Sequence, residues 1–84
     1  MIHFTKHAKD KFRILREHKF KVSKDQIIEI VNSPDLIDRS RSPILIAQKK
    51  ISPTHVLRVV YKKENDNIII ITFYPGRRKH YEKQ

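Results

Sequence analysis

The chain has 84 residues, no cysteine and a formal net charge of +10. A chain of this length forms one small domain, here residues 1–84, and the lack of cysteine excludes a disulfide framework and a thiolate metal site. No apolar run reaches the roughly 20 residues that span a membrane, and lysines interrupt the N-terminal segment. We therefore expect a cytoplasmic protein with no signal peptide and no membrane partner.

Positive charge is concentrated toward the two ends of the chain. Residues 1–24 hold eight Lys/Arg against two acids, residues 25–48 hold two against four, and residues 49–84 hold nine against three. The net charges are thus +6, −2 and +6. A basic surface attracts polyanions, which favours nucleic acid or another acidic partner. Lysine-rich surfaces also occur in proteins of thermophiles, and that alternative stays open.

The first half of the chain has the pattern of two helices. Thr5 is a good N-cap, so the first helix is expected from Lys6 to about His18. Ser23 opens the second with Gln26 as its capping-box partner, and Asn32-Ser33-Pro34 ends it. The residues expected to face the core are Ala8, Phe12, Leu15, Ile27, Ile28, Ile30 and Val31.

The second half has the pattern of strands. The expected segments are Leu36–Arg41, Ile44–Ile51, Val56–Lys62 and Ile68–Tyr74. The last is β-branched and apolar on both faces, which predicts a central strand, and Pro75-Gly76 is expected to end it in a turn. The sequence thus predicts an α+β fold, with two N-terminal helices packed on a twisted antiparallel sheet of about four strands.

The position of Arg58 depends on strand register. If Lys62 pairs with Ile68, Arg58 faces Thr72 and shares a face with Thr72 and Tyr74. A turn one residue tighter would instead place Arg58 opposite Ile71, among apolar side chains. We favour the first register because burying an unpaired guanidinium is costly. Arg58 then either binds a ligand or forms an outward-facing ion pair with an acidic residue.

The segment after the last strand, 77–82, combines guanidinium groups, an imidazole and a phenol. Cleaving RNA without a metal requires a base for the 2′-OH, an acid for the departing 5′-oxygen and cations for the phosphorane. Residues of these types make the segment a candidate site, although a basic terminus is commonly a solvated end. His7, at the start of the first helix, is a second candidate base or phosphate contact, with simple packing or exposure as the alternative. No metal site is expected.

Four stretches together resemble a small bacterial and archaeal family of unknown function related to BrnT and to the RelE/ParE-type toxins. They are Phe4–Ala8, Val22–Ile27 with Asn32–Asp35, Leu57–Tyr61, and Ile70–Pro75 leading to Arg77–Glu82. The resemblance implies a RelE/ParE-like or BrnT-like fold. It also implies a toxin of a type II toxin–antitoxin pair that cleaves mRNA, free or on the ribosome, as a metal-independent endoribonuclease without a cofactor.

In the related enzymes, basic residues and often a tyrosine lie on the concave sheet face and in the C-terminal segment. The catalytic candidates here are His7, Arg58, Tyr74, Arg77, His80 and Tyr81. The candidate nucleic-acid contacts are Lys49, Lys50, Arg58, Arg77, Arg78 and Lys79. An acidic antitoxin is the implied protein partner. The alternative is a non-catalytic module that binds nucleic acid or an acidic partner through the same residues.

Overall fold

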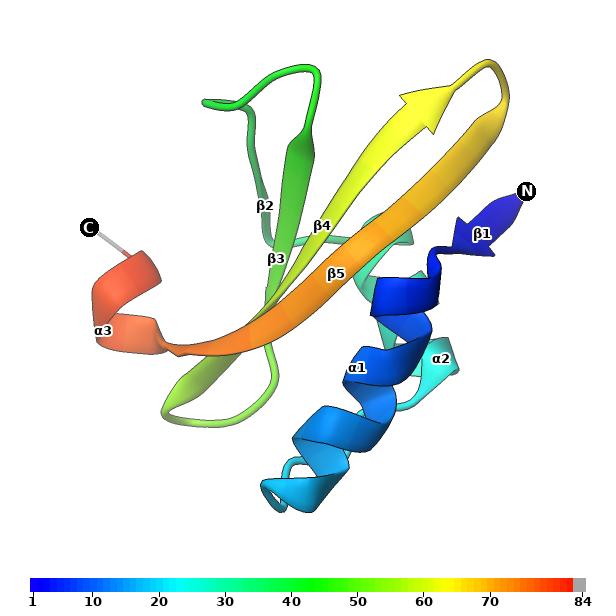
Figure 1. Cartoon of the computed structure of the whole chain (residues 1–84). Helices are drawn as coiled ribbons and strands as arrows, with labels where there is room; N and C mark the ends of the chain where they lie inside the picture. Colours follow the sequence, from blue (N-terminus) through cyan, green and yellow to red (C-terminus); the bar gives the residue numbers. More distant parts are fainter. Residues whose placement is uncertain (83–84) are drawn as a thin grey trace.

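In the computed structural model, which describes residues 1–82, the chain forms an α+β fold with a five-stranded mixed sheet (Figure 1). The strands are β1 (Ile2–Phe4), β2 (Leu36–Asp38), β3 (Leu45–Lys50), β4 (His55–Glu64) and β5 (Asn67–Arg77). The helices are α1 (Lys6–Glu17), α2 (Lys24–Asn32) and α3 (Arg78–Tyr81). The α+β class is confirmed, whereas the sheet has one strand more than expected and the chain one helix more.

The strand order is β1-β5-β4-β3-β2. The pairs from β2 to β5 are antiparallel, as expected, including the β2–β3 hairpin around the cis Ser42–Pro43 bond. The unexpected strand is β1, which pairs in parallel with β5 from Ile2↔Ile68 to Phe4↔Ile70. This pairing joins the two ends of the chain, and no local pattern in the three residues of β1 predicts it.

Both long helices begin where their capping residues predict. Thr5 Oγ1 accepts a hydrogen bond from the Ala8 amide at 3.1 Å, and the reciprocal Ser23–Gln26 capping box is complete. At the end of α1 the chain turns through Lys19, whose φ of 62° lies in the left-handed region. The helix therefore ends in a conformation that usually takes glycine.

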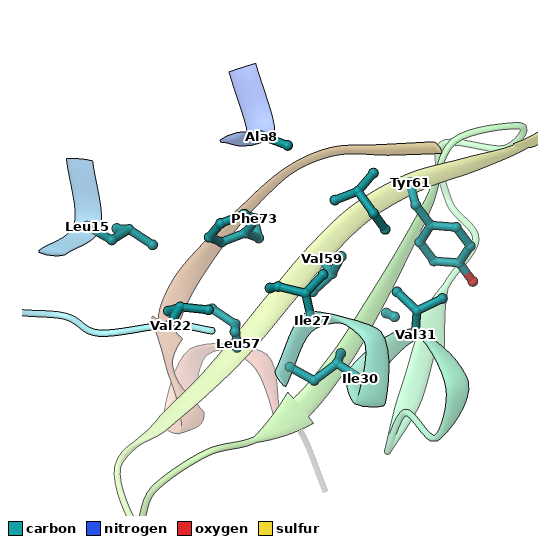
Figure 2. Packing of buried hydrophobic residues seen from close by; sticks show 12 residues of the cluster. Ala8, Leu15, Val22, Ile27, Ile30, Val31, Leu57, Val59, Tyr61 and Phe73 are labelled. Atoms are coloured by element: carbon teal, nitrogen blue, oxygen red, sulfur yellow. The ribbon is translucent and has the colours of Figure 1, made fainter. Parts of the chain in front are cut away.

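The hydrophobic core lies between the sheet and the two long helices (Figure 2). Ala8 and Leu15 come from α1, and Ile27, Ile30 and Val31 come from α2. Their partners on the sheet include Ala47, Leu57, Val59, Tyr61, Ile70 and Phe73. Two of the expected core residues, Phe12 and Ile28, are only partly buried. Burial raises the pKa of the Tyr61 phenol, against a smaller opposing effect of Arg39.

The β4–β5 register differs from both expected registers. Lys62 pairs with Ile69 and Arg58 with Tyr74, and the pairing shifts between Val60↔Thr72 and Tyr61↔Ile70, which leaves Ile71 as an extra residue. Such a bulge lets Arg58, Thr72 and Tyr74 share a face while Ile70 and Phe73 both join the core. The expected shared face is correct, but the expected pairing partners are wrong.

Pro75-Gly76 does not end the last strand as expected, because β5 continues through both residues to Arg77. Proline is tolerated there because β1 pairs with β5 only along Ile68–Ile70, so that the edge of β5 beside Pro75 carries no neighbouring strand. The central strand of the sheet is β4 rather than β5, which was expected there, and β4 has more buried residues than β5.

Candidate functional site

The sheet face opposite α1 and α2 carries a groove of about 480 Å³. Side chains alternate along a strand, so Arg58, Thr72 and Tyr74 point away from the face that holds Val59 and Phe73. Figure 1 shows α1 and α2 together on one side of the sheet and α3 apart from them at the end of β5. The groove is lined by Asp38, Ser40, Arg41, Ile44, Ile46, Arg58, Val60, Thr72, Tyr74 and Tyr81.

Arg58 lies at the centre of a hydrogen-bonded network in this groove. Its Nε donates to Tyr74 Oη at 3.0 Å, its Nη1 to Gln48 Oε1 at 2.5 Å and its Nη2 to Asp38 Oδ2 at 3.2 Å. Three of the five guanidinium N–H groups are thereby engaged, which leaves two. Arg58 forms an ion pair with Asp38 on the face away from the core, as the alternative expected, but its side chain is buried rather than solvated, with 7% exposure.

The network favours the charged forms of both Arg58 and Asp38. Burial lowers the pKa of the Arg58 guanidinium, but the hydrogen bond to Tyr74 and the pair with Asp38 outweigh it, so the net direction is upward. Two hydrogen bonds from Ser40, and then the Arg58 guanidinium, lower the pKa of the Asp38 carboxyl from 3.8 to about 2. The groove floor is therefore a charged pair near neutral pH.

The C-terminal segment folds back onto this groove instead of extending into solvent. The Arg78 amide donates to the Thr54 carbonyl at 2.8 Å, and its guanidinium binds the Pro53 carbonyl and the Glu82 carboxylate. These bonds bring the ring of Tyr81 to 4.3 Å from Arg58 Cζ, a cation–π contact. The structure thus brings together three of the predicted site residues: Arg58, Tyr74 and Tyr81.

Four other predicted residues, all from the C-terminal segment 77–82, do not join the groove. Arg77 pairs with His55 at the end of β5, where strand alternation places it on the helix-bearing face, away from Arg58. Arg77, Arg78 and Lys79 instead line a separate hollow of about 340 Å³ with Pro53, Thr54 and Glu82. His80 is exposed on α3 and lines neither the groove nor this hollow.

The remaining candidates lie elsewhere. His7 is exposed in the first turn of α1, on the helical layer. Lys49 binds the Ser33 carbonyl at 2.8 Å and the Glu29 carboxylate at 3.5 Å, and so it caps the C-terminal end of α2. Lys50 is exposed at the end of β3. A single site that combines all of the predicted residues is therefore not formed.

Sequence reasoning missed the acidic and amide partners of Arg58. The sequence alone groups Asp38 with Asp25, Glu29 and Asp35 as a solvated acidic patch, although Asp38 falls within the expected strand Leu36–Arg41. Asp38 lies on β2, and β3, which carries Gln48, separates it from Arg58 on β4. A usable signal is Gln48, an uncharged polar residue directly after the apolar run Ile44–Ala47. A buried arginine in a neighbouring strand requires such partners.

Within residues 1–82, no group of three or more His, Asp or Glu side chains is placed to hold a metal ion. Over the same residues, no helix is both long and apolar enough to cross a bilayer. No family model, curated protein or solved structure matches the chain. The resemblance to BrnT and the RelE/ParE-type toxins therefore stays a prediction.

Proposed function

We propose that this protein binds single-stranded RNA in the Arg58 groove. The observation that carries the proposal is the meeting of Arg58 and Tyr74, from β4 and β5, in the groove on the sheet face that α1 and α2 leave uncovered. Proteins that bind single-stranded RNA combine a positively charged groove with aromatic rings and guanidinium planes, on which unpaired bases stack.

The long-range attraction to RNA is assigned to the rim of the groove. Asp38 neutralises the charge of Arg58 at short range, so the groove floor alone attracts a polyanion weakly. Arg39 and Arg41 are exposed in the β2–β3 connection, and Arg41 lines the groove. Arg41 is therefore placed to contact a backbone phosphate while a base enters toward Tyr74.

The test is the fluorescence anisotropy of a labelled, unstructured 12-nucleotide RNA, titrated with wild type, Arg41→Gln and Arg16→Gln over a series of salt concentrations. Both variants lose one positive charge from an exposed arginine, but Arg16 lies on α1, across the molecule from the groove. Loss of a phosphate contact should reduce the salt slope by about one and weaken binding several-fold.

The proposal requires that Arg41→Gln causes this loss and that Arg16→Gln causes clearly less. Equal effects would mean that RNA responds only to total charge, and an affinity that neither change alters would remove the groove as the binding site. Circular dichroism spectra of the three proteins serve as the control for folding.

A second candidate, the toxin-like endoribonuclease, is favoured by the hydrogen bond between Arg58 and Tyr74. Tyr74 Oη accepts from Arg58 Nε at 3.0 Å, so the phenol keeps its own proton for donation. In this reading the Asp38 carboxylate, which lines the groove, takes the proton of the 2′-OH as that oxygen attacks phosphorus. Arg58 stabilises the phosphorane, and Tyr74 protonates the 5′-oxygen as its bond to phosphorus breaks. His7 and His80, which do not line the groove, have no part in it, and an acidic antitoxin would neutralise the activity.

One further variant, Tyr74→Phe, separates the two candidates. Tyr74→Phe keeps the ring but removes the proton, so it should abolish cleavage while binding persists. Brief induction in a heterologous bacterium, followed by mapping of transcript 5′ ends, shows whether wild type cleaves at all. New ends with wild type that disappear with Tyr74→Phe support the ribonuclease. Intact transcripts alongside groove-dependent binding in vitro leave the binding module as the function.

A further inference from the structure

Tyr81 occupies the space through which a ligand would reach the Arg58 guanidinium. Its ring lies 4.3 Å from Arg58 Cζ, and its backbone carbonyl accepts a hydrogen bond from Gln48 Nε2 at 3.4 Å. Arg58 is 7% exposed, although it lies on the sheet face that the two long helices leave uncovered. Together with Asp38, Gln48 and Tyr74, the short segment α3 therefore covers a charge that the two long helices leave uncovered.

The two ends of α3 are held with different strength. At its start, Arg78 makes a backbone hydrogen bond of 2.8 Å to Thr54 and a side-chain bond of 3.0 Å to Pro53. At its end, Tyr81 is held to the sheet by the 3.4 Å bond to Gln48 and by its contact with Arg58, while the amide and carboxylate of Glu82 bind Arg78 of the same segment and not the sheet. The helix has four residues, too few to be stable by itself. The segment is thus anchored at one end and weakly held at the other.

The ring of Tyr81 packs closely against Gly76, the only glycine of the chain. A Cβ added to Gly76 would lie 2.7 Å from Cδ2 of Tyr81 and nearer still to Cε2. The φ of Gly76 is not positive, so backbone conformation does not demand glycine there. Close packing of the ring against the backbone of β5 does demand it. The chain is therefore built to accommodate the closed position of Tyr81.

We propose that α3 is a lid on the RNA site, which closes when Tyr81 packs on Arg58 and opens when RNA displaces the ring. The proposal rests on the proposed function and adds its regulation. In the closed state the two remaining N–H groups of Arg58 are shielded from a phosphate, and in the open state they can donate to one. The apparent affinity of the site is reduced by the fraction of molecules that are open.

Two variants open the lid by different means. Gly76→Ala displaces the ring but keeps the tyrosine, and Tyr81→Ala removes the ring. His3→Ala, an exposed change on β1 at the other end of β5, is the matched control. The first readout, which needs no RNA, is the hydrogen-exchange rate of the Arg58 Nε–H measured by NMR. The second is the affinity for the labelled 12-nucleotide RNA.

A lid predicts faster exchange of the Arg58 Nε–H in both variants than in wild type and His3→Ala. If about 90% of wild-type molecules are closed, both variants should also bind the RNA about tenfold more tightly than wild type and His3→Ala. Unchanged exchange in both variants would overturn the lid. So would weaker RNA binding by Tyr81→Ala, because the ring would then be part of the binding surface. If no protein, wild type included, binds RNA, the proposed function fails. The exchange rates alone then decide whether α3 covers Arg58.

Discussion

Replacing Asp38 by asparagine tests whether its carboxylate stabilises the fold through buried Arg58. The variant keeps the shape of the side chain but removes the charge opposite Arg58, which Gln48 and Tyr74 still hold. The pKa of Asp38 is lowered from 3.8 to about 2, first by Ser40 and then by Arg58. At about 1.36 kcal/mol per pKa unit this shift corresponds to at most about 2.4 kcal/mol. Because the side chain is 30% exposed, we expect a loss of about 1 kcal/mol at pH 7.

The stability difference between wild type and Asp38→Asn should depend on pH. The folded pKa of Asp38 lies below the unfolded value, so its stabilisation is fully present above about pH 4 and is lost as the pH falls through about 2. Urea denaturation followed by circular dichroism should therefore show a difference between wild type and Asp38→Asn at pH 7 that shrinks toward pH 2. Asp66→Asn, in the exposed β4–β5 turn, is the control. A difference that is absent at pH 7, or constant down to pH 2, would refute the reasoning.

Three further substitutions test the packing and the backbone by denaturation at pH 7. Thr72→Val should raise the free energy of unfolding by about 1 kcal/mol, because among residues 1–82 Thr72 Oγ1 is buried without a hydrogen-bond partner. A lower free energy of unfolding would mean that the hydroxyl does have a partner. Lys19→Gly should raise the free energy of unfolding by about 0.5–1 kcal/mol, because a φ of 62° strains a residue that has a Cβ. An unchanged free energy of unfolding would contradict the strained end of α1. Phe73→Ala should lower the free energy of unfolding by about 3–5 kcal/mol, because the ring is fully buried and its centroid lies 4.7 Å from that of Phe12. A decrease below about 1 kcal/mol would contradict the position of Phe73 in the core.

Local chemistry explains which parts of the fold the sequence could predict. Thr5 and the Ser23–Gln26 pair act within one helical turn, so both helix starts were predictable from adjacent residues. The β2–β3 and β4–β5 hairpins likewise follow from turn residues between apolar runs. The pairing of β1 with β5 joins residues separated by almost the whole chain, and nothing local encodes it.

The candidate site was predictable in part for the same reason. Arg58 stands out as a charge within an apolar strand, and Tyr74 follows on the next strand, so a shared face could be predicted from alternation. The exact pairing could not, because Arg58 pairs two residues further along β5 than expected. The β4–β5 turn accounts for one of these residues and the bulge at Ile71 for the other. The ion pair of Asp38 with Arg58 crosses the intervening strand β3, so no local pattern predicts it. The contact of Tyr81 with Arg58 depends on the close packing of the Tyr81 ring against Gly76, where a side chain would clash.

The most direct test of the central claim is an NMR titration of the ¹⁵N-labelled protein with the 12-nucleotide RNA. Binding in the Arg58 groove predicts shift changes that concentrate at Ser40, Arg41, Tyr74 and Tyr81 and in the Arg58 Nε–H. Resonances of α1 and α2, on the other side of the sheet, should change little. Shift changes that concentrate on α1, or that spread evenly over all exposed basic residues, would contradict the account.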